Sequence, residues 1–212
     1  MADVTVPNAI ESYGIAWREL QRCFLELLLV GVVWLLLSAP SGWLQDSFLG
    51  VVYHVLVLGP VSFGGMYAFL RAARGDTPQV GDLFVPFQRS YAQAVLASLL
   101  VSVLVAIGMV LLIVPGVIAA VRLAWVPYLV VDERMDAAAS IRESWERTRG
   151  YGWTIFAIFL IAIPLVLIGL VLLVVGVIPA MMLVQLASAV LFAAVSTRLR
   201  VAREAGVAVV PP

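Results

Sequence analysis

Four long stretches without a charged side chain constrain this sequence more than any motif does. They cover residues 27–45, 47–70, 90–121 and 150–197. A helix that crosses a membrane needs about 20 consecutive apolar residues, so the first two stretches hold one such helix each. The last stretch, with helix breakers at Gly176 and Pro179, holds two. The third passes Pro115-Gly116 and ends at Arg122, which predicts one helix before this turn and another after it that contains the arginine.

Composition indicates the same class of protein. Apolar residues make up 63% of the chain and charged residues only 12%, which is far outside the range of soluble domains. We therefore expect an all-α integral membrane protein that forms a single membrane domain over residues 1–212. Its six transmembrane helices are expected near residues 24–38, 48–70, 91–114, 115–131, 153–175 and 178–197, with an outer turn at residues 39–42.

The arginines predict the orientation in the membrane. All thirteen basic residues are arginine, and Arg122 is the only one inside a predicted transmembrane helix. The other twelve precede the first helix, follow the sixth, or lie in the second and fourth connections. Positive charge accumulates on the cytoplasmic side of membrane proteins, so both termini are predicted to be cytoplasmic.

Two segments outside the transmembrane helices have helical amphipathic patterns. Residues 9–21 place four apolar residues on one face at helical spacing, namely Ile10, Tyr13, Trp17 and Leu20. Residues 136–149 place Ile141 and Trp145 on one face, with Asp136 as candidate N-cap, a favourable Glu143–Arg147 pair, and Gly150 after the last turn. Both are expected to lie at the membrane interface.

An internal repeat suggests how these parts are organised. Residues 107–114 (IGMVLLIV) match residues 168–175 (IGLVLLVV), and the sequence GVI follows at 116–118 and 176–178. Each predicted hairpin is also preceded by an aromatic residue beside charge, at Trp17-Arg18, Phe87-Gln88-Arg89 and Trp145-Glu146-Arg147. We therefore predict three transmembrane hairpins, each preceded by a cytoplasmic amphipathic helix.

Three polar residues are expected inside the membrane. Arg122, His54 and Gln185 are each predicted about 10 Å from the outer boundary, where they would form one polar layer. Ionisable residues at such positions indicate either a functional site or a structural hydrogen bond to the carbonyls of a broken helix. Arg122 is expected to reach outward to Asp46, with His54 or the carbonyls around Pro115-Gly116 as competing acceptors.

Helix 136–149 is the other candidate site. Ile141, Trp145, Arg142 and Arg149 could form a docking surface for a protein partner or for anionic lipid headgroups. The alternative is an interfacial helix that only holds the hairpins together, with Trp145 packed against them.

The sequence offers little for catalysis. One cysteine, Cys23, and one histidine, His54, cannot form a usual zinc site or a redox pair, so we expect no metal, cofactor or catalytic residue. Asp132, Glu133 and Asp136 could hold a cation, or serve as helix caps balanced by neighbouring arginines. A nucleic-acid partner is not expected, because topology already explains the arginines.

Several motifs together resemble a widespread, largely uncharacterised bacterial family of six-span membrane proteins. The best-known relatives of that family are the membrane domains fused to some glycerophosphodiester phosphodiesterases. The motifs are Gly59-Pro60 with Gly64-Gly65, Leu83-Phe84 with Phe87, residues 111–116, Arg122, Pro127, residues 131–133, and Ser144-Trp145 through Gly150-Tyr151.

The resemblance implies a location in the bacterial inner membrane. It does not carry over the enzymatic activity, because the sequence contains no soluble phosphodiesterase domain. We therefore predict a non-enzymatic scaffold or accessory subunit of a membrane complex, with the lipid bilayer and possible membrane-protein subunits as partners. The alternative is a protein that handles lipids or transports small solutes.

Overall fold

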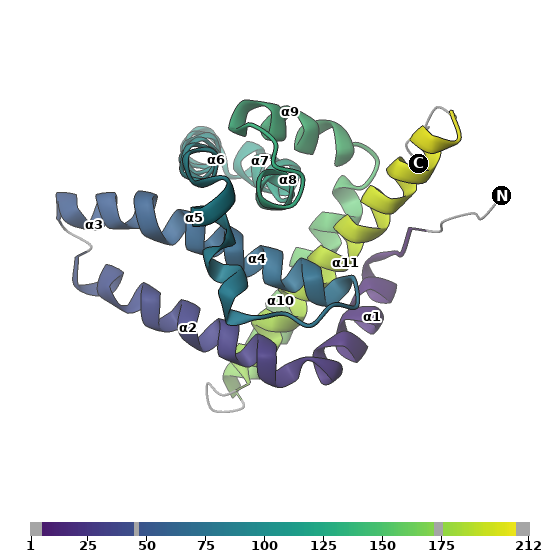
Figure 1. Ribbon diagram of the computed structural model, residues 1–212, viewed down its shortest axis with the longest axis horizontal. Coiled ribbons are helices and arrows are strands. Elements are labelled where there is room, and N and C mark those ends of the chain that lie inside the picture. Colours follow the sequence, from purple (N-terminus) through teal and green to yellow (C-terminus); the bar gives the residue numbers. More distant parts are fainter. Residues whose placement is uncertain (1–5, 45–46, 172–175, 207–212) are drawn as a thin grey trace. The chain divides into compact units, whose positions relative to one another are not determined.

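The computed structural model describes residues 6–44, 47–171 and 176–206, and every regular element in these ranges is a helix. In chain order the elements are α1 (Ala9–Arg22), α2 (Phe24–Trp43), α3 (Phe48–Tyr53), the π-helix η1 (His54–Leu58), α4 (Gly59–Ala73), the 3₁₀-helix η2 (Val80–Phe84), α5 (Val85–Arg89), α6 (Tyr91–Leu111), α7 (Ile113–Leu123), α8 (Val126–Val131), α9 (Ala137–Arg147), α10 (Gly152–Val171) and α11 (Val177–Glu204) (Figure 1).

Six helical segments are long and apolar enough to cross a membrane, judged by length and composition. They are Phe24–Trp43, Phe48–Ala73, Tyr91–Leu111, Val114–Val131, Gly152–Leu170 and Val177–Glu204. The prediction of an all-α chain with six such segments is confirmed. By its internal contacts the chain divides into two compact units: residues 1–28, 69–77 and 149–212 form the first, and residues 29–68 and 78–148 form the second.

In the second unit, a proline interrupts the helix that runs from α3 to α4. Pro60 has no N–H, so the carbonyl of Leu56 loses its usual helical donor. The Tyr91 hydroxyl donates to this carbonyl at 3.1 Å. Just before the proline, the Gly59 N–H donates to the His54 carbonyl, five residues back, which is the π-helical spacing. The helix thus continues past Gly59-Pro60 with one irregular turn, and a side chain from α6 satisfies the freed carbonyl.

The expected outer turn at residues 39–42 is wrong. These residues belong to α2, which continues through Pro40 to Trp43. A helix satisfies its own backbone groups where no water is available, and a proline near its last turn removes only one of those bonds. The Tyr53 hydroxyl also donates to the Leu37 carbonyl in this turn. The helix therefore ends at Trp43, not at the proline.

Two glycine pairs allow adjacent helices to approach closely. A β-carbon on Gly108 would lie 2.8 Å from the Cα of Gly116. One on Gly169, in the first unit, would lie 2.6 Å from the carbonyl oxygen of Gly176. These are equivalent glycines in the internal repeat, so the sequence match corresponds to the same close packing in both places.

In the first unit, α1 packs against α10 and α11 through a face that the sequence did not predict. The buried residues of α1 are Ala9, Ser12, Ala16 and Leu20. Two residues of the expected apolar face, Ile10 and Trp17, are 77% and 52% exposed. Small side chains let helix axes come close, whereas large apolar side chains at a membrane interface lose little by pointing away from the protein. Within that expected face, only Leu20 is buried.

Tyr13 fixes α1 to α10. Its hydroxyl donates to the Ile158 carbonyl at 2.8 Å. Burial raises the pKa of the Tyr13 hydroxyl to about 12 from its usual value of 10.0, because a buried phenolate would lose hydration.

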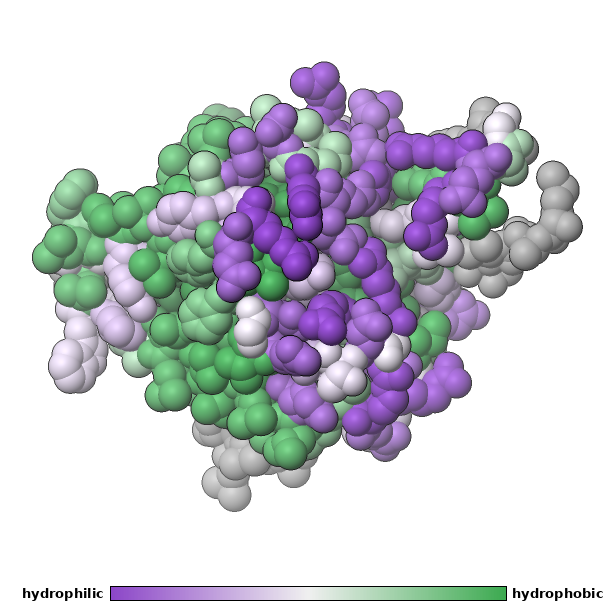
Figure 2. All heavy atoms as spheres, viewed as in Figure 1, coloured by the Kyte–Doolittle hydropathy of each residue, from purple (hydrophilic) through white to green (hydrophobic). Residues whose placement is uncertain are grey.

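A cluster of apolar residues from α4, α6, α7, α8 and α9 forms one core of the second unit. Its buried members are Phe63, Ala94, Ala97, Leu123, Val126, Val130, Val131 and Ala137. Figure 2 shows hydrophilic side chains gathered over α9 and α5, whereas α2 and α3 are covered by apolar ones. The surface of this unit is therefore strongly divided between apolar and polar regions.

Candidate functional site

The candidate site is the place where α9 covers the break between α7 and α8. Helix α7 ends at Leu123, and α8 begins at Val126 with Pro127 in its first turn. Pro127 cannot donate to the Leu123 carbonyl, and a proline at the start of a helix is tolerated because the first N–H groups have no helical acceptor. The predicted span at residues 115–131 is therefore two helices.

Hydroxyl groups of α9 occupy this break. The Ser144 hydroxyl donates to the Arg122 carbonyl at 2.7 Å, and the Thr148 hydroxyl lies 3.5 Å from the same oxygen. Both Ser144 and Thr148 are fully buried. The end of α7 is thus capped by side chains, which compensates for part of the cost of interrupting a helix in apolar surroundings.

The guanidinium of Arg122 lies over the indole of Trp145. Its central carbon is 5.8 Å from the ring centroid, within the range of a cation–π interaction. Nη1 of Arg122 is buried, and no group in the described ranges accepts a hydrogen bond from it. A cation–π contact contributes from about 0.5 to about 2 kcal/mol or more, but it provides no hydrogen-bond acceptor. The indole therefore leaves the buried Nη1 of Arg122 without an acceptor.

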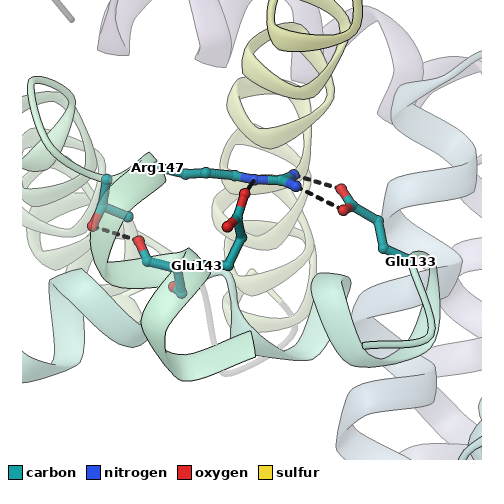
Figure 3. Close-up of polar contacts among 5 residues, drawn as sticks. Glu133, Glu143 and Arg147 are labelled. Carbon is teal, nitrogen blue, oxygen red and sulfur yellow. Dashed lines mark hydrogen bonds and ion pairs between the residues drawn. The ribbon is translucent and has the colours of Figure 1, made fainter. Parts of the chain in front are cut away.

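A second arginine fixes α9 to the loop that precedes it. Two nitrogens of Arg147 donate to the two carboxylate oxygens of Glu133, and Nε donates to Glu143 at 2.7 Å (Figure 3). The Arg147 side chain is only 7% exposed. Burial by itself lowers the pKa of Arg147, but the hydrogen bonds and charges of Glu133 and Glu143 outweigh it and raise the pKa. Arg147 is therefore a fixed cation with two acidic partners.

The inner face of α9 consists of small residues. Its buried positions, extended by one residue past the helix end, are Ala137, Ser140, Ser144 and Thr148. They face α6, α7 and α8, which are the neighbours of α9 in this unit. The first N–H of the helix, that of Ala137, donates to the Gln93 side chain of α6 at 2.9 Å. Asp136 occupies the N-cap position, but its side chain makes no capping hydrogen bond.

The structure corrects the predicted orientation of Trp145. The face predicted from Ile141 and Trp145 is not the buried one: Ile141 is half-buried against the core, and Trp145 is 40% exposed. The small residues of α9 lie on its inner face, where they allow close packing against α6, α7 and α8. The indole of Trp145 lies beside this face and packs against Arg122. Arg142 is exposed as expected. Arg149, also exposed, belongs to the other compact unit.

Asp46, the expected partner of Arg122, lies outside the described residues. Within the described residues, Arg122 contacts Trp145 of α9. The sequence predicts Arg122 about 10 Å from the outer boundary and α9 on the cytoplasmic side, which would be about 20 Å apart in depth. A direct contact brings the two to a similar depth, so these two predicted depths do not both hold.

The polar layer expected from Arg122, His54 and Gln185 stays a prediction. His54 is exposed on the surface of η1. Gln185 is partly buried in α11 and belongs to the first unit. The expected Glu143–Arg147 pair is confirmed. The bond from Arg147 to Glu133 was not predictable from helical spacing, because it depends on the path of the loop before α9.

No cluster that could hold a metal ion is found within the described ranges, in which three or more His, Cys, Asp or Glu side chains nowhere converge. Glu133, one of the three acids considered for a cation, is bonded to Arg147. No protein-family model matches the chain, and no solved structure is significantly similar to it.

Proposed function

We propose that the six apolar helices span the cytoplasmic membrane of a bacterium as three hairpins, with both termini in the cytoplasm. In this arrangement α1, the η2–α5 segment and α9 are interfacial helices on the cytoplasmic side. The proposal is supported by the arginine distribution and by the six apolar segments. It agrees with the resemblance to the bacterial six-span family.

We further propose that the protein is a non-enzymatic scaffold or accessory subunit of a membrane complex. The supporting observation is the way α9 is held. Its ends and middle are fixed by Gln93, by the Arg122 carbonyl and by Glu133. Its charged groups at Arg142 and Glu146 remain exposed. A surface helix that is locked on one face and charged on the other is a rigid platform for a partner protein at the membrane.

Charge reversal on the exposed face of α9 tests this role. The variant Arg142→Glu with Glu146→Arg preserves net charge and touches no contact that holds α9. We expect a partner to copurify in mild detergent at fixed stoichiometry with the natural protein and to be lost from this variant. Arg89→Glu, an exposed change on α5, is the control and should retain the partner. Equal recovery of the partner with the α9 variant, or no stoichiometric partner at all, would reject the role.

Lipid handling is the second candidate function. It is favoured by Arg122, whose Nη1 is buried without a hydrogen-bond acceptor in the described ranges. A protein that only supports a complex has no need for an unpaired charge at this position.

A further inference from the structure

The side chain of Arg122 has an unmet requirement for an anion. Nη1 is buried, and no group in the described part of the chain accepts a hydrogen bond from it. By contrast, Arg147 of α9 is neutralised by Glu133 and Glu143. The contact with Trp145 covers one face of the Arg122 guanidinium but supplies no acceptor in its plane. An oxyanion would satisfy both the charge and the free N–H groups.

The surface that leads to Arg122 is apolar. Val114 and Ile118 precede Arg122 at intervals of four residues, so the three lie along one face of α7. Val114 is 68% exposed and Ile118 is 49% exposed. This face is therefore an open apolar strip that ends at a guanidinium, and the partly exposed indole of Trp145 lies at the same end. Tryptophan is enriched where apolar and polar regions of a membrane meet.

We propose that Arg122 binds the phosphate of a membrane phospholipid, with an acyl chain along Val114 and Ile118 and Trp145 beside the headgroup. An acyl chain fits the apolar strip, and a phosphodiester provides oxygens for the planar guanidinium. A free phosphate ion has the same oxygens but gains nothing from the strip. The inference rests on the proposed membrane location and not on the accessory-subunit role, so failure of the charge-reversal test on α9 leaves it standing.

Binding of defined lipids to the delipidated full chain tests the proposal. The probes are dioleoyl phosphatidylglycerol, dioleoylglycerol, which lacks the phosphate, and inorganic phosphate, each added to detergent micelles and followed by native mass spectrometry. The variants are Arg122→Gln, Arg122→Lys, and Arg89→Gln on α5 as an exposed control with the same change of charge. We expect phosphatidylglycerol to bind the natural chain and the control equally, and Arg122→Gln about tenfold more weakly. Arg122→Lys, which keeps the charge but loses the planar fork, should be intermediate.

Three results would overturn the proposal. The first is equal binding of phosphatidylglycerol to the natural chain and to Arg122→Gln. The second is equal binding of dioleoylglycerol, which would show that the phosphate is not recognised. The third is displacement of the lipid by inorganic phosphate, which would indicate a site for a soluble anion. Should Arg122→Gln not fold, the melting temperature of the natural chain decides: phosphatidylglycerol should raise it and dioleoylglycerol should not.

Discussion

The ion pairs of Arg147 give the sharpest prediction about stability. Arg147→Met removes three charge-assisted hydrogen bonds, two to Glu133 and one to Glu143. Each such bond contributes about 1.5–3 kcal/mol when its groups are shielded from water. The two carboxylates are 30% and 24% exposed, so water regains part of their hydration once the arginine is gone. We therefore expect a loss of about 2–4 kcal/mol in the free energy of unfolding, less than the three bonds would sum to.

A double-mutant cycle measures the pair itself. Arg147→Met, Glu133→Gln and the combined variant are compared by equilibrium unfolding in mixed micelles with increasing dodecyl sulfate. We expect a coupling energy above about 1 kcal/mol between Arg147 and Glu133. The control is the pair Arg22–Glu19 on α1, where the arginine side chain is 47% exposed and coupling should stay below about 0.5 kcal/mol. A coupling for Arg147–Glu133 no larger than that of the control would refute the reasoning.

Two further predictions concern close packing and alkaline pH. A β-carbon at Gly64 would lie 2.2 Å from the backbone carbonyl of Leu83, whereas the nearest atom to one at Gly65 is 3.6 Å away. Gly64→Ala should therefore lower the melting temperature sharply, while the adjacent Gly65→Ala should leave it unchanged or raise it, and equal effects would contradict the packing. For Tyr13, the folded pKa of about 12 exceeds the usual 10.0, so folding favours the neutral phenol. The free energy of unfolding should decline from about pH 10 to about pH 12. Tyr13→Phe should remove the part of this decline that is due to Tyr13, when unfolding is measured across the same pH range. An identical decline in both proteins would contradict the prediction.

The positions of the long apolar helices were predictable because charged residues mark their limits directly. The uncharged stretches correspond to α2, to α3 with α4, to α6 with α7, and to α10 with α11. Proline was a less dependable mark, because α2 continues through Pro40. The pair Glu143–Arg147 was predictable because residues four apart on a helix are neighbours. These features depend on local sequence alone.

The buried faces of α1 and α9 were not predictable from apolar periodicity. Both helices bury alanine and serine and leave a tryptophan partly exposed, at Trp17 and Trp145. A periodicity argument assumes that large apolar residues face the core, which holds where the alternative is water. Beside a membrane the alternative is lipid, so close contact of helix axes decides which face is buried.

The contact between Arg122 and α9 required the tertiary structure. Nothing in the spacing of residues indicates that the carbonyl of Arg122 accepts a hydrogen bond from Ser144. That contact depends on the loop between α8 and α9, in which Arg134 has a positive φ of 53°. A non-glycine residue in this conformation has no dependable signature in one sequence.

The orientation of the chain in the membrane is the central claim, and cysteine labelling tests it most directly. Gly42 and Gly81 are both exposed, and a β-carbon at either would meet no atom within 4 Å. Each is changed to cysteine in a Cys23→Ala background and treated in intact spheroplasts with a membrane-impermeant maleimide. The account predicts labelling of Gly42→Cys at once and of Gly81→Cys only after permeabilisation. Labelling of Gly81→Cys but not of Gly42→Cys in intact spheroplasts would contradict it.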